Sequence, residues 1–91
     1  MVELKKVPVE AFNETLKMFA DGLEEMIKRH QGEAGFDRLF FKGIVYERDN
    51  IMMGFCLGLE TVGLIDKEVY QNWVNEATRT FNAIVDKYFL K

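Results

Sequence analysis

IMMGFCLGLETVGLIDKEVYQNWVNEA, residues 51–77, is the stretch that decides the fold. In it, an apolar and glycine-rich segment leads to Gly63, and Asp66 precedes a new amphipathic segment. Glycine is common just after the end of a helix, and aspartate is a favoured residue at the start of one. The stretch therefore predicts two helices joined by a very short connection.

The residues that follow Asp66 predict one long helix, which starts at 66 or 67 and continues nearly to residue 89. Large apolar side chains recur there at helical spacing, and polar residues occupy the opposite face. The apolar positions are Tyr70, Trp73, Val74, Ala77, Phe81, Ile84, Val85, Tyr88 and Phe89.

The first third of the chain predicts another amphipathic helix, over about residues 8–31. Its apolar positions alternate in steps of three and four, which is the spacing of a helix seam. They are Val9, Phe12, Leu16, Phe19, Leu23 and Met26, with His30 at the end. Gly32 and Gly35 follow the predicted end of this helix.

The middle segment, residues 36–62, is apolar over most of the circumference of a helix. One broad arc of the helical wheel holds Phe41, Ile44, Val45, Ile51, Met52, Phe55, Leu59 and Val62. A second stripe beside it holds Gly43, Gly54 and Gly58, together with Glu47, Asn50 and Thr61. Such a helix is buried on more than one side, and glycines let another backbone approach closely.

Two other arrangements of the middle segment remain open at this point. Residues 39–46 are rich in aromatic and β-branched side chains, and residues 47–50 read as a turn. This pattern fits a β-hairpin at about 38–58 and an α+β fold, although Gly54 and Gly58 would weaken its second strand. In the other arrangement, the helix breaks near residues 49–50.

We predict an all-α fold for residues 1–91, a single domain that forms a three-helix up-down bundle with a long central apolar helix. The helices are expected at 8–31, 36–62 and 66–89. Because three helices cannot cover the central one on all sides, we expect a homodimer across a two-fold axis. Its predicted interface residues are Gly43, Glu47, Asn50, Met52, Met53, Gly54, Phe55 and Gly58.

Composition argues against several classes of protein. A net charge of −3 and a pI near 5.1 lack the basic footprint of a nucleic-acid binder. Residues 1–10 lack the apolar core of a signal peptide, and the longest apolar run, residues 51–59, is too short to cross a bilayer. The single cysteine excludes an internal disulfide. We therefore expect a cytoplasmic protein that binds neither nucleic acid nor membrane.

The sequence contains no recognisable catalytic or metal-binding set. The chain has no serine, and the residue three before His30 is Ile27, so the Glu-x-x-His motif of di-iron bundles is absent. Cys56 stands in an apolar run, where a free thiol behaves as a small hydrophobe. We expect a protein that is not an enzyme and holds no cofactor and no metal.

A charged island, YERDN at residues 46–50, interrupts the apolar segment. We expect Glu47 or Asp49 to pair with a basic residue of the same helix and so fix its register. The alternative is an acid that recognises a ligand, and Glu47 is the candidate because it lies on the glycine stripe.

The function we predict is protein–protein interaction by a homodimeric regulator or adaptor, with another protein as a further partner. A small-molecule-binding module is the alternative, with a pocket lined by the glycine stripe and Glu47. A DNA-binding regulator is the weaker alternative. Two features argue against DNA binding. Leu59 occupies the position where helix-turn-helix motifs place a small residue, and the acidic pair Asp66 and Glu68 would repel phosphates.

Overall fold

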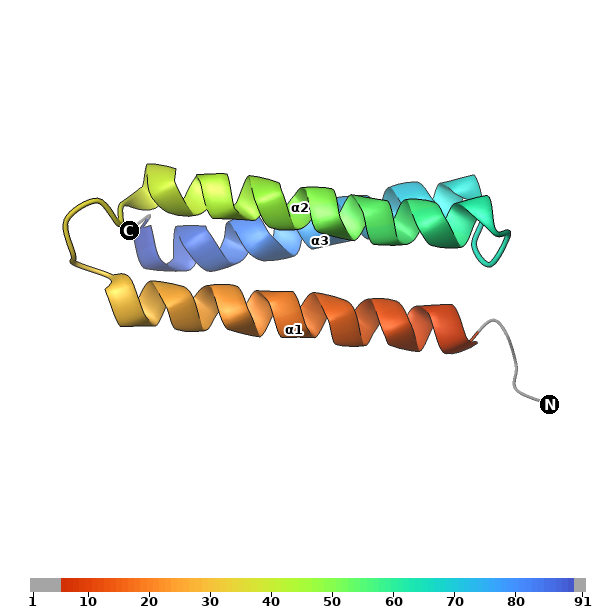
Figure 1. Cartoon of the computed structure of the whole chain (residues 1–91), viewed down its shortest axis with the longest axis horizontal. Helices are drawn as coiled ribbons and strands as arrows, with labels where there is room; N and C mark the ends of the chain where they lie inside the picture. Colours follow the sequence, from red (N-terminus) through yellow and green to blue (C-terminus); the bar gives the residue numbers. More distant parts are fainter. Residues whose placement is uncertain (1–5, 90–91) are drawn as a thin grey trace.

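The computed structural model describes residues 6–89, which form a bundle of three α-helices. They are α1 (Lys6–His30), α2 (Arg38–Thr61) and α3 (Lys67–Phe89). The helices run side by side in alternating directions, and α3 passes behind α2 in the view of Figure 1. The contact between α2 and α3 is the most extensive of the three. The predicted all-α, up-down three-helix bundle is confirmed, and every helix end lies within two residues of its predicted position.

The central segment is one continuous helix that passes through Asp49 and Asn50. No strand occurs within residues 6–89, so the alternative β-hairpin at about 38–58 is wrong, and so is the break at residues 49–50. The buried positions of α2 explain this outcome, because they recur four, seven and four residues apart. They are Phe41, Val45, Met52 and Cys56. This is the period of a helix face, and packing on that face overrides the local β propensity.

The connection between α2 and α3 contains the glycine that ends one helix and the aspartate that caps the next, as the sequence predicts. Gly63 adopts a φ of 81°, and the Leu64 N–H donates to the Leu59 carbonyl over 2.9 Å. This hydrogen bond runs from a residue just after the helix end back to the last helical turn and is typical of a helix C-terminus. It requires a positive φ at the preceding residue, and glycine adopts that conformation without strain. The Asp66 carboxylate then accepts a 2.8 Å hydrogen bond from the Val69 N–H and caps α3.

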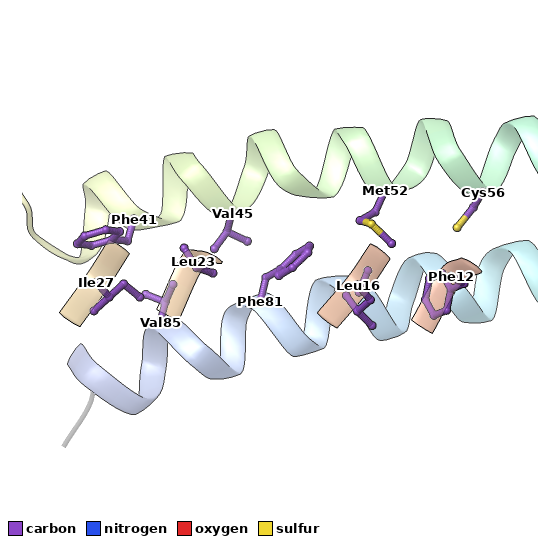
Figure 2. Packing of buried hydrophobic residues seen from close by; sticks show 11 residues of the cluster. Phe12, Leu16, Leu23, Ile27, Phe41, Val45, Met52, Cys56, Phe81 and Val85 are labelled. Carbon is purple, nitrogen blue, oxygen red and sulfur yellow. The ribbon is translucent and has the colours of Figure 1, made fainter. Parts of the chain in front are cut away.

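The core is a single apolar layer enclosed by the three helices (Figure 2). α1 contributes Phe12, Leu16, Leu23 and Ile27, α2 contributes Phe41, Val45, Met52 and Cys56, and α3 contributes Ala77, Phe81 and Val85. No charged or polar residue is fully buried in the described part of the chain. Apolar burial therefore holds the bundle together.

The predicted seam of α1 needs one correction at each end. Ile27 is fully buried whereas Met26 is only half-buried, and Val9 is 45% exposed. A seam drawn with a spacing of 3.5 residues drifts around a straight helix, which has 3.6 residues per turn. The buried face of α1 keeps the true helical period, so it passes through Ile27.

Candidate functional site

The face of α2 that points away from α1 and α3 is the least covered apolar surface of the described residues. Six of the ten exposed large hydrophobic side chains lie on this one helix. They are Leu39, Phe40, Tyr46, Ile51, Met53 and Leu57. Exposed apolar side chains gathered in this way mark interaction sites in other proteins.

This surface is a second helix seam. We define the outer face of α2 by nine of its exposed residues, a set that leaves out Phe40 and Ile51 at one edge: Leu39, Gly43, Tyr46, Glu47, Asn50, Met53, Gly54, Leu57 and Gly58. Within it, positions 39, 43, 46, 50, 53 and 57 follow one another in alternating steps of four and three. That spacing is the pattern of helices that pack against a partner helix. α2 therefore carries a second set of residues at seam spacing, and α1 and α3 leave this set exposed.

Three glycines lie exposed on the outer face, and nothing in the chain approaches them. A Cβ atom added at Gly43, Gly54 or Gly58 would meet no atom within 4 Å. Each glycine inside a helix costs about 1 kcal/mol relative to alanine. No contact within one chain offsets that cost, because the close approach of a second backbone expected from the sequence does not occur in the monomer.

The structure places most, but not all, of the eight predicted interface residues on the outer face of α2. Six of them lie on the outer face: Gly43, Glu47, Asn50, Met53, Gly54 and Gly58. Met52 was placed wrongly, because it is fully buried on the opposite side of α2. It follows Val45 by seven residues, and this spacing keeps it on the core-facing seam. Phe55 also lies off the outer face, since it is half-buried and packs against the core.

Sequence reasoning missed three large side chains that dominate the outer face. Leu39 is 79% exposed, Tyr46 is 71% exposed and Leu57 is 49% exposed. The signal that could have found them is the alternation of four- and three-residue steps through positions 39 to 57. The broad apolar arc of the same helix concealed this alternation.

Glu47 carries the only charge on the outer face, and it lies open to solvent. It takes part in none of the ion pairs between described residues. It also lines none of three open pockets beside α1, whose volumes are about 290 to 370 Å³. A small-molecule site needs concave walls that enclose most of a ligand. The surroundings of Glu47 provide an exposed helix face instead.

The basic residues at the start of α2 pair with α3 and not with the acids of their own helix. The Arg38 guanidinium lies 3.3 Å from the Asp86 carboxylate. The Lys42 ammonium donates to the Asn82 amide oxygen over 2.6 Å and lies 3.6 Å from Asp86. The expected ion pair within α2 is therefore replaced by contacts that fix the register between α2 and α3.

Arg48 lies on the core-facing side of α2, where it reaches α1. Its guanidinium is 5.8 Å from the centre of the Phe19 ring, within the range of a cation–π contact. The guanidinium also lies beside Gly22 of α1, where an added Cβ atom would be 3.8 Å from it, an ordinary van der Waals contact. Arg48 thus covers part of the boundary between α1 and α2.

Asp49 is the neighbouring acid, and its environment disfavours its charge. One carboxylate oxygen, Oδ1, is shielded from solvent and has no hydrogen-bond partner among the described residues. Desolvation by burial raises the pKa of Asp49, and the Thr78 side chain partly opposes this shift. An ionised carboxylate here weakens the folded state relative to the unfolded chain.

We predict that Asp49→Asn stabilises the protein at neutral pH by up to about 1 kcal/mol, because solvent screening reduces the effect of a carboxylate that is only partly buried. The pKa is higher in the folded state than in the unfolded chain, so the wild type loses stability as pH rises through the interval between the two values. The variant cannot ionise, so its advantage should vanish below the unfolded pKa of about 4. Urea unfolding between about pH 3 and pH 7 measures the difference.

Glu76→Gln is the matched control for this prediction, because Glu76 is an exposed acid of α3. We expect it to change the free energy of unfolding by less than about 0.5 kcal/mol at either pH. An Asp49→Asn variant that is less stable than the wild type at neutral pH would contradict the interpretation of Asp49.

His30 and Cys56 carry the side-chain types used in metal binding and nucleophilic catalysis, but their surroundings are those of structural residues. The His30 imidazole stacks on Phe36 at a centroid distance of 4.5 Å, and its Nδ1 lies 3.0 Å from the Glu33 carboxylate. Burial raises the pKa of the Cys56 thiol to about 11, so it stays protonated at neutral pH. Within residues 6–89, no three acidic, histidine or cysteine side chains cluster as metal ligands.

Comparison with protein families, curated proteins and solved structures gives no match to this chain. No helix among the described residues has the length and apolarity needed to cross a bilayer. The outer face of α2 is therefore the feature on which a functional proposal rests.

Proposed function

We propose that this protein is a non-catalytic interaction protein whose binding surface is the outer face of α2, and that its first partner is a second copy of itself. The observation that carries the proposal is the second seam of α2. It has the spacing of a packing helix, and it is exposed along the length of the helix.

The composition of the outer face supports burial against another protein. Its large side chains are apolar or aromatic apart from Glu47 and Asn50, and lysine and arginine are absent from it. Depletion of charge at the centre of a patch distinguishes interfaces from ordinary surface. Burying this apolar area releases about 25 cal/mol per Å² before the costs of association are subtracted.

A second copy is the partner that the face itself suggests. Most oligomers of one chain are two-fold dimers, in which the same patch lies on both sides of the interface. The outer face offers both protruding side chains, such as Tyr46, and glycine surfaces that can accept them. We propose a homodimeric regulator or adaptor in the cytoplasm, where a single reduced cysteine such as Cys56 is common.

Leu57→Glu tests the proposal, because it places a charge on the seam at an exposed position. We expect the wild type to be a dimer and this variant to be a monomer by size-exclusion chromatography with light scattering, with an unchanged helical circular dichroism spectrum. Met18→Glu is the matched control, since Met18 is 62% exposed on α1, outside the outer face.

The control variant should remain dimeric. A Leu57→Glu variant with the same dimer mass as the wild type would place the interface elsewhere. A wild type that is monomeric throughout would contradict self-association.

A further inference from the structure

We propose that the two copies pair with their α2 helices antiparallel, centred on Asn50, so that glycines of one copy receive large side chains of the other. This inference rests on the proposed self-association and adds its geometry. In it, Gly43 receives Leu57 of the second copy, and Gly54 receives Tyr46.

The spacing of the outer face around Asn50 is the first support. Gly43 and Leu57 lie seven residues before and seven residues after Asn50. Tyr46 and Gly54 lie four residues before and four residues after it. Two antiparallel helices that cross at Asn50 place equally distant residues opposite one another. Each pair then joins a large side chain to a glycine. The two-fold symmetry repeats each of these contacts, so that each occurs twice in the interface.

The room available at these positions is the second support. The glycine surfaces are open, because no atom of the chain lies within 4 Å of a Cβ added at Gly43 or Gly54. Tyr46 is 71% exposed and Leu57 is 49% exposed, so neither side chain must leave the core to enter the other copy. The monomer therefore presents both halves of each contact without rearrangement.

A parallel pairing packs the same residues poorly. Identical positions would then face one another, with Tyr46 against Tyr46 and Gly54 against Gly54. The large pairs hold the helices apart, and the glycine pairs leave voids at that separation. Protein interiors and well-packed interfaces have few such voids, and each void lowers stability. Alternation of large and small residues across the facing helices avoids this conflict.

Charge at the edge of the face supports the same direction. Lys42 and Glu60 are 18 residues apart, which is five turns of a helix, so they lie on the same edge of α2. In an antiparallel pair related by a two-fold axis, the same edges of the two helices meet. The edge that carries Lys42 in one copy then faces the edge that carries Glu60 in the other, while the Lys42 ammonium keeps its contacts with Asn82 and Asp86 of α3. The two helix dipoles also oppose one another favourably.

Disulfide cross-linking of single-cysteine variants tests the direction. All variants carry Cys56→Ala, which removes the native thiol. We expect Gly43→Cys and Leu57→Cys to give no cross-linked dimer alone and to cross-link when mixed in equal amounts, because a disulfide needs Cα atoms within about 7 Å. Parallel helices would reverse this pattern, with each variant cross-linking to itself.

Asn50→Cys separates failure of the direction from failure of the interface, because position 50 faces itself in either arrangement. If Asn50→Cys cross-links and Leu57→Cys alone also does, the antiparallel geometry is overturned while the interface stands. If Asn50→Cys gives no cross-linked dimer and light scattering gives a monomer, both the geometry and the proposed self-association are overturned.

Discussion

Replacing Phe81 by alanine is expected to lower the free energy of unfolding by about 3–5 kcal/mol. Phe81 is fully buried in the middle of the core, among side chains from all three helices (Figure 2). Its removal loses the transfer free energy of a large ring and leaves a cavity that the helices cannot fully close. A small domain is stable by only about 5–15 kcal/mol, so the variant should be near its limit of folding.

Urea unfolding followed by circular dichroism measures this loss. Phe81→Leu keeps the test quantitative if the alanine variant fails to fold, and a loss smaller than that of Phe81→Ala is expected because the cavity is smaller. Met18→Ala is the control, since Met18 is 62% exposed, and its effect should be within about 0.5 kcal/mol. Equal losses for Phe81→Ala and Met18→Ala would show that the core is misassigned.

Replacing Gly54 by leucine is expected to abolish dimer formation while making the single chain more stable. The monomer has open space at this position, and leucine is the better helix former by close to 1 kcal/mol. In the dimer, the added side chain occupies the surface that receives Tyr46 of the other copy. The two effects therefore have opposite signs, which a general loss of folding cannot imitate.

Light scattering reports the mass of Gly54→Leu, and thermal unfolding at low protein concentration reports the stability of its single chain. Ala83→Leu is the matched control, because Ala83 is exposed on α3 and the change also adds a large apolar side chain to a helix. We expect the control to keep the mass of the wild type. A dimeric Gly54→Leu protein at the lowest concentration measured would mean that the glycine surface is not at the interface.

Most of the fold could be predicted from the sequence because its signals are local. The end of α2 and the start of α3 depend on Gly63 and Asp66, whose backbone conformation and cap involve only neighbouring residues. α3 has one clearly apolar face and one polar face, so its periodicity identifies its buried side without knowledge of its neighbours.

The orientation of α2 could not be predicted, because a helix that is apolar around most of its circumference does not reveal which side faces the core. Met52 and Met53 are adjacent and equally apolar, yet Met52 is buried and Met53 is 40% exposed. The partners of Arg38 and Lys42 were likewise out of reach. Asp86 lies 48 residues after Arg38, and only the packing of α3 against α2 brings the two together.

The mass of the wild-type protein in solution, measured by light scattering across a dilution series, tests the outer face of α2 most directly. We predict twice the mass of one chain at high concentration, with a decrease towards the mass of one chain on dilution. A mass of one chain at every concentration would contradict self-association and, with it, the antiparallel pairing about Asn50.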